Sequence, residues 1–147
     1  MFLFDESFNE PARATQSLPM RDLFYFLPFG YLFTILIETP ILIFGLPKPV
    51  TLRQRFWCGV WLTACTYPIV VLVLPAIFFN ESRAGYLFVA ETFAPVAECI
   101  LFWLAFRKRV ELTTPRWIQA FAAITVANLA SFGLGEVVNY YGWFGLF

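Results

Sequence analysis

Three glutamates, Glu38, Glu91 and Glu98, are the residues of this chain whose type and position could do chemistry, because each lies inside a long apolar run. A charged side chain at bilayer depth costs at least about 2.5 kcal/mol. No lysine or arginine lies within these runs, so no basic side chain there can neutralise the carboxylates. Such a carboxyl group can be protonated, can bind a cation, or can accept hydrogen bonds from polar neighbours.

Polar side chains near the middle of two other runs could orient these carboxyl groups. Thr66 lies near the middle of run 56–79 and shares a helical face with Thr63, whose hydroxyl could also contact a carboxyl group. Asn128 and Ser131 share one helical face of run 117–138. Hydroxyl and amide contacts between membrane helices contribute roughly 0.6–2 kcal/mol each. We therefore expect Thr66, Asn128 and Ser131 to orient a proton- or cation-binding site that the three glutamates form.

Counting residues places two of the carboxyl groups at the same depth. Glu38 precedes Lys48 by ten residues, and Glu98 precedes Arg107 by nine. At 1.5 Å per helical residue, each carboxyl lies about 13–15 Å from that basic residue. Glu91 lies two helical turns before Glu98, about 10 Å further away. We expect Glu38 and Glu98 to face one another across the folded chain, with Glu91 on the path to the outer side.

Prolines near the glutamates leave two interpretations open. Pro40 follows Glu38 by two residues, and Pro95 lies between Glu91 and Glu98. A proline in a helix frees an upstream carbonyl, and a freed carbonyl beside a carboxylate could bind a hard cation. The prolines could instead only kink the helices. The glutamates could likewise be neutral, purely structural groups, or could contact another subunit.

Four apolar runs must position these residues, and they cover 23–47, 56–79, 84–106 and 117–138. A helix needs about 20 apolar residues to cross a bilayer, and each run meets that length. Hydrophobic residues make up 60% of the 147 residues, and charged residues make up 14%. We expect an all-α integral membrane protein, one domain over 1–147 built as a bundle of four transmembrane helices with short loops, and an outer tail over 1–21.

Local signals mark the start of three helices. Thr51 and Gln54 have the spacing of a capping box before the second helix. Ser82 can cap the third helix. Thr114 and Pro115 supply an N-cap and a proline at the first helical position of the fourth.

The basic residues are unevenly distributed between the two sides of such a bundle. Seven lysines and arginines fall in the loops after the first and third runs, and three fall on the other side. The positive-inside rule places loops 48–55 and 107–116 in the cytoplasm and both termini outside. We expect the protein to lie in a bacterial inner membrane.

The partners that we expect are the lipid bilayer and other membrane helices. Gly133 and Gly135 would let the fourth helix pack closely against a neighbour. A four-helix unit of this size has little interior, so we expect a homo-oligomer or association with partner membrane subunits. The net charge of zero argues against a nucleic-acid partner.

The chain contains no histidine, which removes the usual protein ligands of many haem and zinc sites and the Glu-x-x-His motif of di-iron bundles. It also has no P-loop and no G-x-G-x-x-G motif. We expect no cofactor and no enzyme activity, and the sequence leaves a bound metal ion open. The favoured function is transport or channel-like handling of protons or small cations through the intramembrane carboxylates. The alternative is a non-catalytic structural or accessory subunit of a larger membrane complex.

Overall fold

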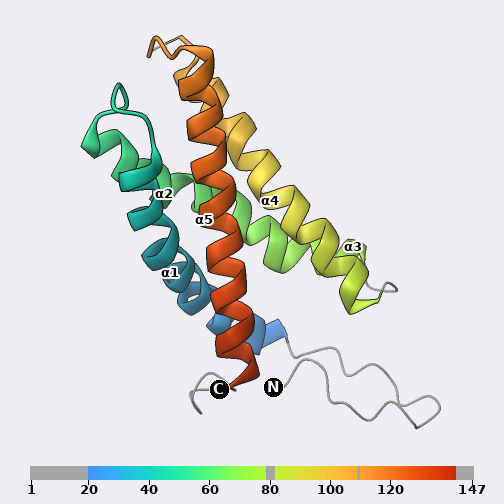
Figure 1. The fold of residues 1–147 in the computed structure, drawn as a ribbon. Helices are drawn as coiled ribbons and strands as arrows, with labels where there is room; N and C mark the ends of the chain where they lie inside the picture. Colours follow the sequence, from blue (N-terminus) through green and yellow to red (C-terminus); the bar gives the residue numbers. More distant parts are fainter. Residues whose placement is uncertain (1–19, 79–81, 109, 142–147) are drawn as a thin grey trace, which may run out of the picture.

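The computed structural model describes residues 20–78, 82–108 and 110–141, and this part of the chain is all-helical. Its elements in chain order are α1 (Met20–Gly45), α2 (Leu52–Pro68), the π-helix η1 (Ile69–Val73), α3 (Leu74–Ile77), α4 (Arg83–Phe106) and α5 (Thr114–Tyr140) (Figure 1). α2, η1 and α3 follow one another without a break. The described residues therefore form four helical segments, each long and apolar enough to cross a membrane.

The observed helices coincide with the four predicted runs but begin earlier. α1 includes the last two residues of the predicted tail, whose residues 1–19 lie outside the described part. α2 begins at Leu52 rather than at residue 56, because a cap holds its polar first turn in the helix. Gln54 N donates to Thr51 Oγ1 at 3.4 Å, and Thr51 N donates to Gln54 Oε1 at 2.9 Å, which confirms the capping box.

The predicted starts of α4 and α5 have different outcomes. Ser82 Oγ accepts a backbone N–H from the first turn of α4 at 3.1 Å, which confirms that cap. In α5, Trp117 N donates to Thr113 O at 3.1 Å, so the acceptor of the first helical hydrogen bond is the carbonyl of Thr113. Thr114 is consequently the first helical residue instead of the N-cap, and Pro115 occupies the second helical position.

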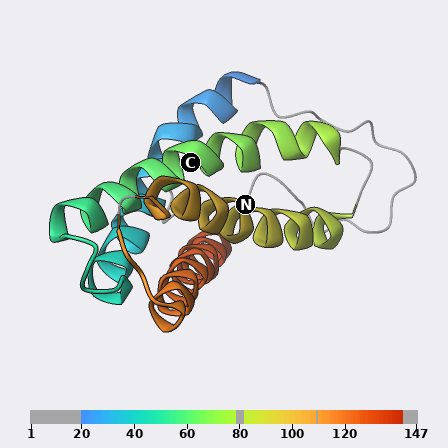
Figure 2. The ribbon, with the colours of Figure 1, turned by 90° about the horizontal axis from the view of Figure 1, so that it is seen from above.

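The four segments form a ring in which each packs against two others. α1 packs against α2 and α5, and α4 also packs against α2 and α5. α1 and α4 therefore occupy opposite corners of the ring, and so do α2 and α5. Toward the end where α4 begins, α3 and the first turns of α4 extend away from α1 and α5 (Figures 1 and 2).

The two ends of this ring differ in packing. We call the end that carries the connections 46–51 and 107–113 the basic end, and the opposite end the open end. A cluster of buried apolar side chains lies between the basic end and the middle of the helices. It comprises Leu42, Leu46, Val50, Cys58, Leu62, Phe102, Phe106, Ala120, Ala123, Ile124 and Ala127. Toward the open end, the buried hydrophobic residues of the described chain are Leu74 and Ala90.

Two glycines set close approaches between helices. A Cβ on Gly59 of α2 would lie 2.7 Å from the Cα of Thr39, and a Cβ on Gly45 would lie 2.8 Å from a side-chain atom of α5. A Cβ on Gly133 or Gly135 would meet nothing within 4 Å. The predicted close packing through Gly133 and Gly135 is therefore not found within the described chain, because the Cα–Cβ direction at each of these glycines leads into open space.

Side chains from two neighbouring helices complete the end of α1. Prolines at positions 47 and 49 have no N–H, so the carbonyls four residues earlier, those of Ile43 and Gly45, lack helical donors. Arg55 Nη1 donates to Ile43 O at 2.8 Å, and Gln119 Nε2 donates to Gly45 O at 2.9 Å. Arg55, which the sequence assigns only to a basic loop, thus also ties α2 to α1.

The π-helix η1 widens the helical segment just before Pro75. A proline ring clashes with the carbonyl four residues earlier, and a π turn moves that carbonyl away. In this register Leu74 N donates to Ile69 O. The next bond would need an N–H from Pro75 to Val70 O, which proline cannot supply. Tyr86 of α4 takes its place, since its hydroxyl donates to Val70 O at 3.0 Å.

Candidate functional site

Two carboxyl groups lie buried in the middle of the ring. Glu38 of α1 and Glu98 of α4 are each only 2% exposed. They belong to opposite corners of the ring, and both reach the polar side chains of α2 and α5 that lie between them. Lysine and arginine are absent from 22–47, 56–82, 84–106 and 117–147, so the polar neighbours of the pair are neutral hydroxyl and amide groups.

Each carboxyl oxygen has a hydrogen-bond partner on another helix. For Glu38, Thr63 Oγ1 lies 2.7 Å from Oε2 and Ser131 Oγ lies 2.8 Å from Oε1. For Glu98, Thr66 Oγ1 lies 2.8 Å from Oε1 and the amide nitrogen of the α5 asparagine lies 2.8 Å from Oε2. Such contacts compensate for the lost hydration of a buried carboxyl group.

The pattern of these contacts places the two carboxyl groups in one layer. α2 and α5 both run from the basic end to the open end, so Thr63 and Asn128 lie nearer the basic end than Thr66 and Ser131. The α1 carboxyl bonds to Thr63 and Ser131, and the α4 carboxyl bonds to Thr66 and Asn128. Each carboxyl group therefore has one partner at the depth nearer the basic end and one partner at the depth nearer the open end. The two carboxyl groups must therefore lie at the same depth, between these two pairs of partners, and they are close enough to interact electrostatically.

The partners also contact backbone carbonyls of their own helices. Thr63 Oγ1 lies 2.8 Å from Gly59 O, and Thr66 Oγ1 lies 3.2 Å from Leu62 O. Ser131 Oγ lies 2.9 Å from the carbonyl oxygen three residues earlier. Each hydroxyl therefore stands between a carboxyl oxygen and a backbone carbonyl oxygen.

The structure brings five of the six predicted proton-binding and orienting residues together. Glu38, Glu98, Thr66, Asn128 and Ser131 form one hydrogen-bonded network. Thr63, which the sequence places on the same helical face as Thr66 because of their spacing of three residues, also belongs to this network through its contact with Glu38 Oε2.

Glu91 lies apart from this network. It is half-buried on α4, two turns closer to the open end than Glu98, and it takes no part in the four contacts that hold the two buried carboxyl groups. It interacts electrostatically with Glu38 and with Glu136 of α5. Its predicted place on the open side of the pair is compatible with this position, whereas direct participation in the carboxyl network is not observed.

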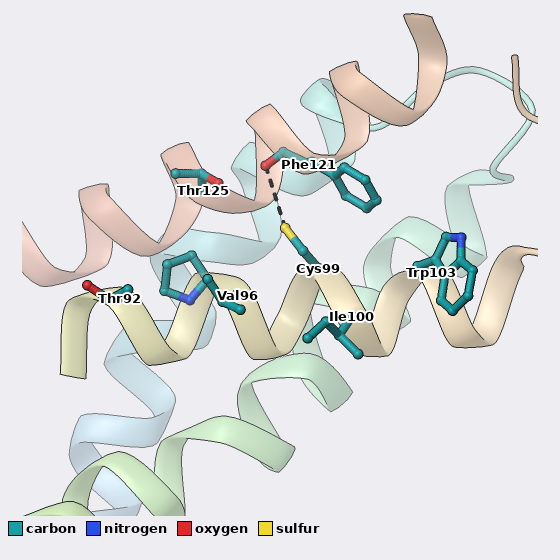
Figure 3. A pocket seen from close by; sticks show the side chains of 8 residues that line it. Thr92, Val96, Cys99, Ile100, Trp103, Phe121 and Thr125 are labelled. Carbon is teal, nitrogen blue, oxygen red and sulfur yellow. Dashed lines mark hydrogen bonds between the residues drawn. The ribbon is translucent and has the colours of Figure 1, made fainter. Parts of the chain in front are cut away.

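A groove of about 590 Å³ lies on the outer side of α4 and α5 (Figure 3). Its lining includes Cys99, Trp103, Phe121 and Thr125, and the Cys99 thiol lies 3.9 Å from Phe121 O. Neither buried glutamate lines it. Cys99 follows Glu98 directly in the chain, so the groove and the carboxyl network lie on different faces of α4.

The network can hold charge or protons, because it combines two acidic groups with neutral groups that donate and accept hydrogen bonds. The described residues contain no group of three or more histidine, cysteine, aspartate or glutamate side chains that could hold a metal ion. Comparisons with protein-family models, curated proteins and solved structures find no match to this chain.

Proposed function

We propose that this chain is an integral membrane protein that binds and transfers protons or small cations through the buried pair Glu38 and Glu98. The observation that carries this proposal is that two acids share one layer of an apolar bundle with neutral hydroxyl and amide partners. Each ionised carboxylate at that depth costs at least about 2.5 kcal/mol, and apolar side chains would pack there without that cost. A site that binds a cationic species accounts for the presence of both acids at this depth.

The packing around the pair supports access from one side. The apolar cluster, with Leu62, Phe102 and Ile124 fully buried, fills the basic end below the carboxyl layer. Among the residues whose side chains the structure describes, fewer are buried at the open end, and Glu91 lies there at half-burial. We place the entry of the transferred species at the open end, and passage to the basic end requires the apolar cluster to rearrange.

A second candidate function is that of a non-catalytic subunit in a larger membrane complex. The groove between α4 and α5 and the uncovered glycines of α5 favour it, because both leave helix faces free for other membrane helices. In that function the glutamate network would fix the packing of the four helices and would transfer nothing.

Proton and cation flux into liposomes distinguishes the two functions. Purified protein is reconstituted into vesicles that contain a pH-sensitive dye, and a pH gradient or a potassium gradient is imposed. We expect flux with the unchanged chain and a fall to the rate of empty vesicles with Glu38→Gln and Glu98→Gln combined, because neither amide can be ionised.

The matched control is Glu111→Gln, which removes an exposed carboxyl group from the connection before α5 and should leave the flux unchanged. Equal flux from the double variant and the unchanged chain would contradict the proposal. Absence of flux from the unchanged chain would favour the accessory-subunit function.

A further inference from the structure

We infer that the species bound by the Glu38–Glu98 pair is a proton, and that Thr63, Thr66 and Ser131 accommodate it by reversing their hydrogen bonds. This inference rests on the proposed function and names the ion. The positions of the hydroxyl groups determine how the hydrogen bonds of the network change when it gains a proton.

A hydroxyl group has one proton to donate and can also accept. Thr63 Oγ1 lies 2.7 Å from Glu38 Oε2 and 2.8 Å from Gly59 O, which are both acceptors when the carboxyl is ionised. The hydroxyl can donate to only one of them at a time. Thr66, between Glu98 Oε1 and a backbone carbonyl, and Ser131, between Glu38 Oε1 and a backbone carbonyl, have the same choice.

These choices give the network two complete hydrogen-bond patterns. When Glu38 is ionised, the Thr63 hydroxyl donates to Oε2. When Oε2 carries a proton, that O–H donates to Thr63 Oγ1, and the threonine hydroxyl turns to donate to Gly59 O. The O–H bond of the carboxyl forms as the proton arrives, and no hydrogen bond of the carboxyl group is lost in either state.

Asn128 differs from the hydroxyl groups because it cannot reverse. Its Nδ2 lies 2.8 Å from Glu98 Oε2 and 3.1 Å from Ile124 O. Both neighbours are acceptors, so the NH₂ group must face them, and turning the amide would set its oxygen against Ile124 O. A proton on Glu98 is therefore confined to Oε1, on the side of Thr66.

The same contacts disfavour a metal cation. Ca²⁺ takes six to eight oxygen ligands, and Mg²⁺ demands near-ideal octahedral geometry with six. Here the Asn128 amide is a fixed donor to Glu98 Oε2, so the pair offers a metal ion three carboxyl oxygens. Among the described residues, the titratable groups in electrostatic contact with the pair are Glu91 and Cys99, both on α4. α2 and α5 contribute neutral groups.

Infrared difference spectroscopy of the purified protein tests the inference without a membrane. The carboxylic C=O stretch appears only when a carboxyl group is protonated, and its frequency reports the hydrogen bond that the O–H makes. On acidification we expect a C=O band that disappears in the Glu38→Gln and Glu98→Gln double variant. Thr63→Val and Thr66→Val should shift this band, and Thr63→Ser and Thr66→Ser should restore it.

The matched control is Thr39→Val, which removes a buried hydroxyl at the same crossing of α1 and α2. Within the described part of the chain Thr39 Oγ1 has no hydrogen-bond partner, so the band should keep its frequency. In liposomes, Thr63→Val and Thr66→Val should each slow proton flux about tenfold, the effect of one lost hydrogen bond in the transfer step.

The outcomes separate this inference from the proposed function. A shifted band in the valine variants together with no flux from the unchanged chain would support the hydroxyl reversal and contradict transport. Flux and band that are both unchanged in the valine variants would overturn the inference and leave the proposed function standing. Loss of the C=O band on addition of sodium or calcium ions at constant pH would contradict the inference that the bound species is a proton.

Discussion

The central residues of this protein are two acids whose partners are neutral. A buried carboxylate beside a lysine or arginine forms an ion pair, and its charge is then fixed by its partner. Glu38 and Glu98 instead meet hydroxyl groups and one amide at 2.7–2.8 Å. Hydroxyl groups can donate or accept, so they stabilise both protonation states of the acid. This property suits the pair to the proton binding and release that we propose.

One buried hydroxyl at this level has no such role. Thr39 is 6% exposed, and its Oγ1 lacks a hydrogen-bond partner in the described structure. A buried polar group without a partner keeps a desolvation cost. We expect Thr39→Val to raise the free energy of unfolding by about 1 kcal/mol, measured by titration with SDS from mild detergent.

The control for this prediction is Thr34→Val on the same helix, because Thr34 Oγ1 donates to Gly30 O at 2.9 Å. That variant loses a hydrogen bond and should not gain stability. If Thr39→Val lowers stability as much as Thr63→Val does, the Thr39 hydroxyl has a hydrogen-bond partner. Thr39→Val would then be unsuitable as the control in the infrared experiment.

At the scale of the elements, the site depends on the arrangement of the four helical segments around the ring. α2 and α5 each present two polar residues three positions apart, and α1 and α4 each contribute one carboxyl. Because the acids come from opposite corners, both reach α2 and α5. The crossing of α1 and α2 is the tightest part of this arrangement, since Gly59 packs directly against the backbone of Thr39.

Substitution of Gly59 tests this crossing. A Cβ at that position would lie 2.7 Å from Thr39 Cα and would also contact Thr39 Oγ1, so the helices must move apart. We expect Gly59→Ala to lower the free energy of unfolding by about 1–3 kcal/mol, the usual cost of overpacking, as measured by the same SDS titration.

Gly133→Ala is the comparison, since a Cβ there meets nothing within 4 Å. It should keep or raise stability, because alanine favours a helix over glycine by about 1 kcal/mol. Equal stability of the two variants would show that the α1–α2 crossing is looser than described.

At the scale of the whole molecule, the apolar cluster lies at the end that carries most of the lysines and arginines of the sequence. Lys48, Arg53, Arg107 and Lys108 are exposed beside the connections of the basic end. If this end is cytoplasmic, the sealed side of the carboxyl layer faces the cytoplasm, and the open side faces out. Entry from the open end then means entry from outside.

Labelling of single cysteines tests this orientation. In a background with Cys58, Cys65 and Cys99 replaced by alanine, Lys48→Cys and Tyr140→Cys place one exposed thiol near each end. With a membrane-impermeant maleimide on intact spheroplasts, we expect Tyr140→Cys to react at once and Lys48→Cys only after lysis. The reverse pattern would invert the assignment of inside and outside, and reaction of both in intact cells would indicate mixed insertion.

The sequence by itself determined what depends on local chemistry. Helix length and apolar content define the four segments, caps such as Thr51 with Gln54 set helix starts, and residue counts put Glu38 and Glu98 at one depth. The hydrogen-bonding types of Thr66, Asn128 and Ser131 made them candidates to meet the acids.

Only the tertiary structure decided which helices are neighbours and which faces turn inward. A membrane helix is apolar toward both lipid and protein, so its pattern alone does not identify the packed face. The structure therefore selects Gly45 and Gly59, in place of Gly133 and Gly135, as the points of close approach. It pairs Thr63 with Glu38 and Thr66 with Glu98, and it separates Glu91 from the acid network, because those contacts depend on how four helices cross.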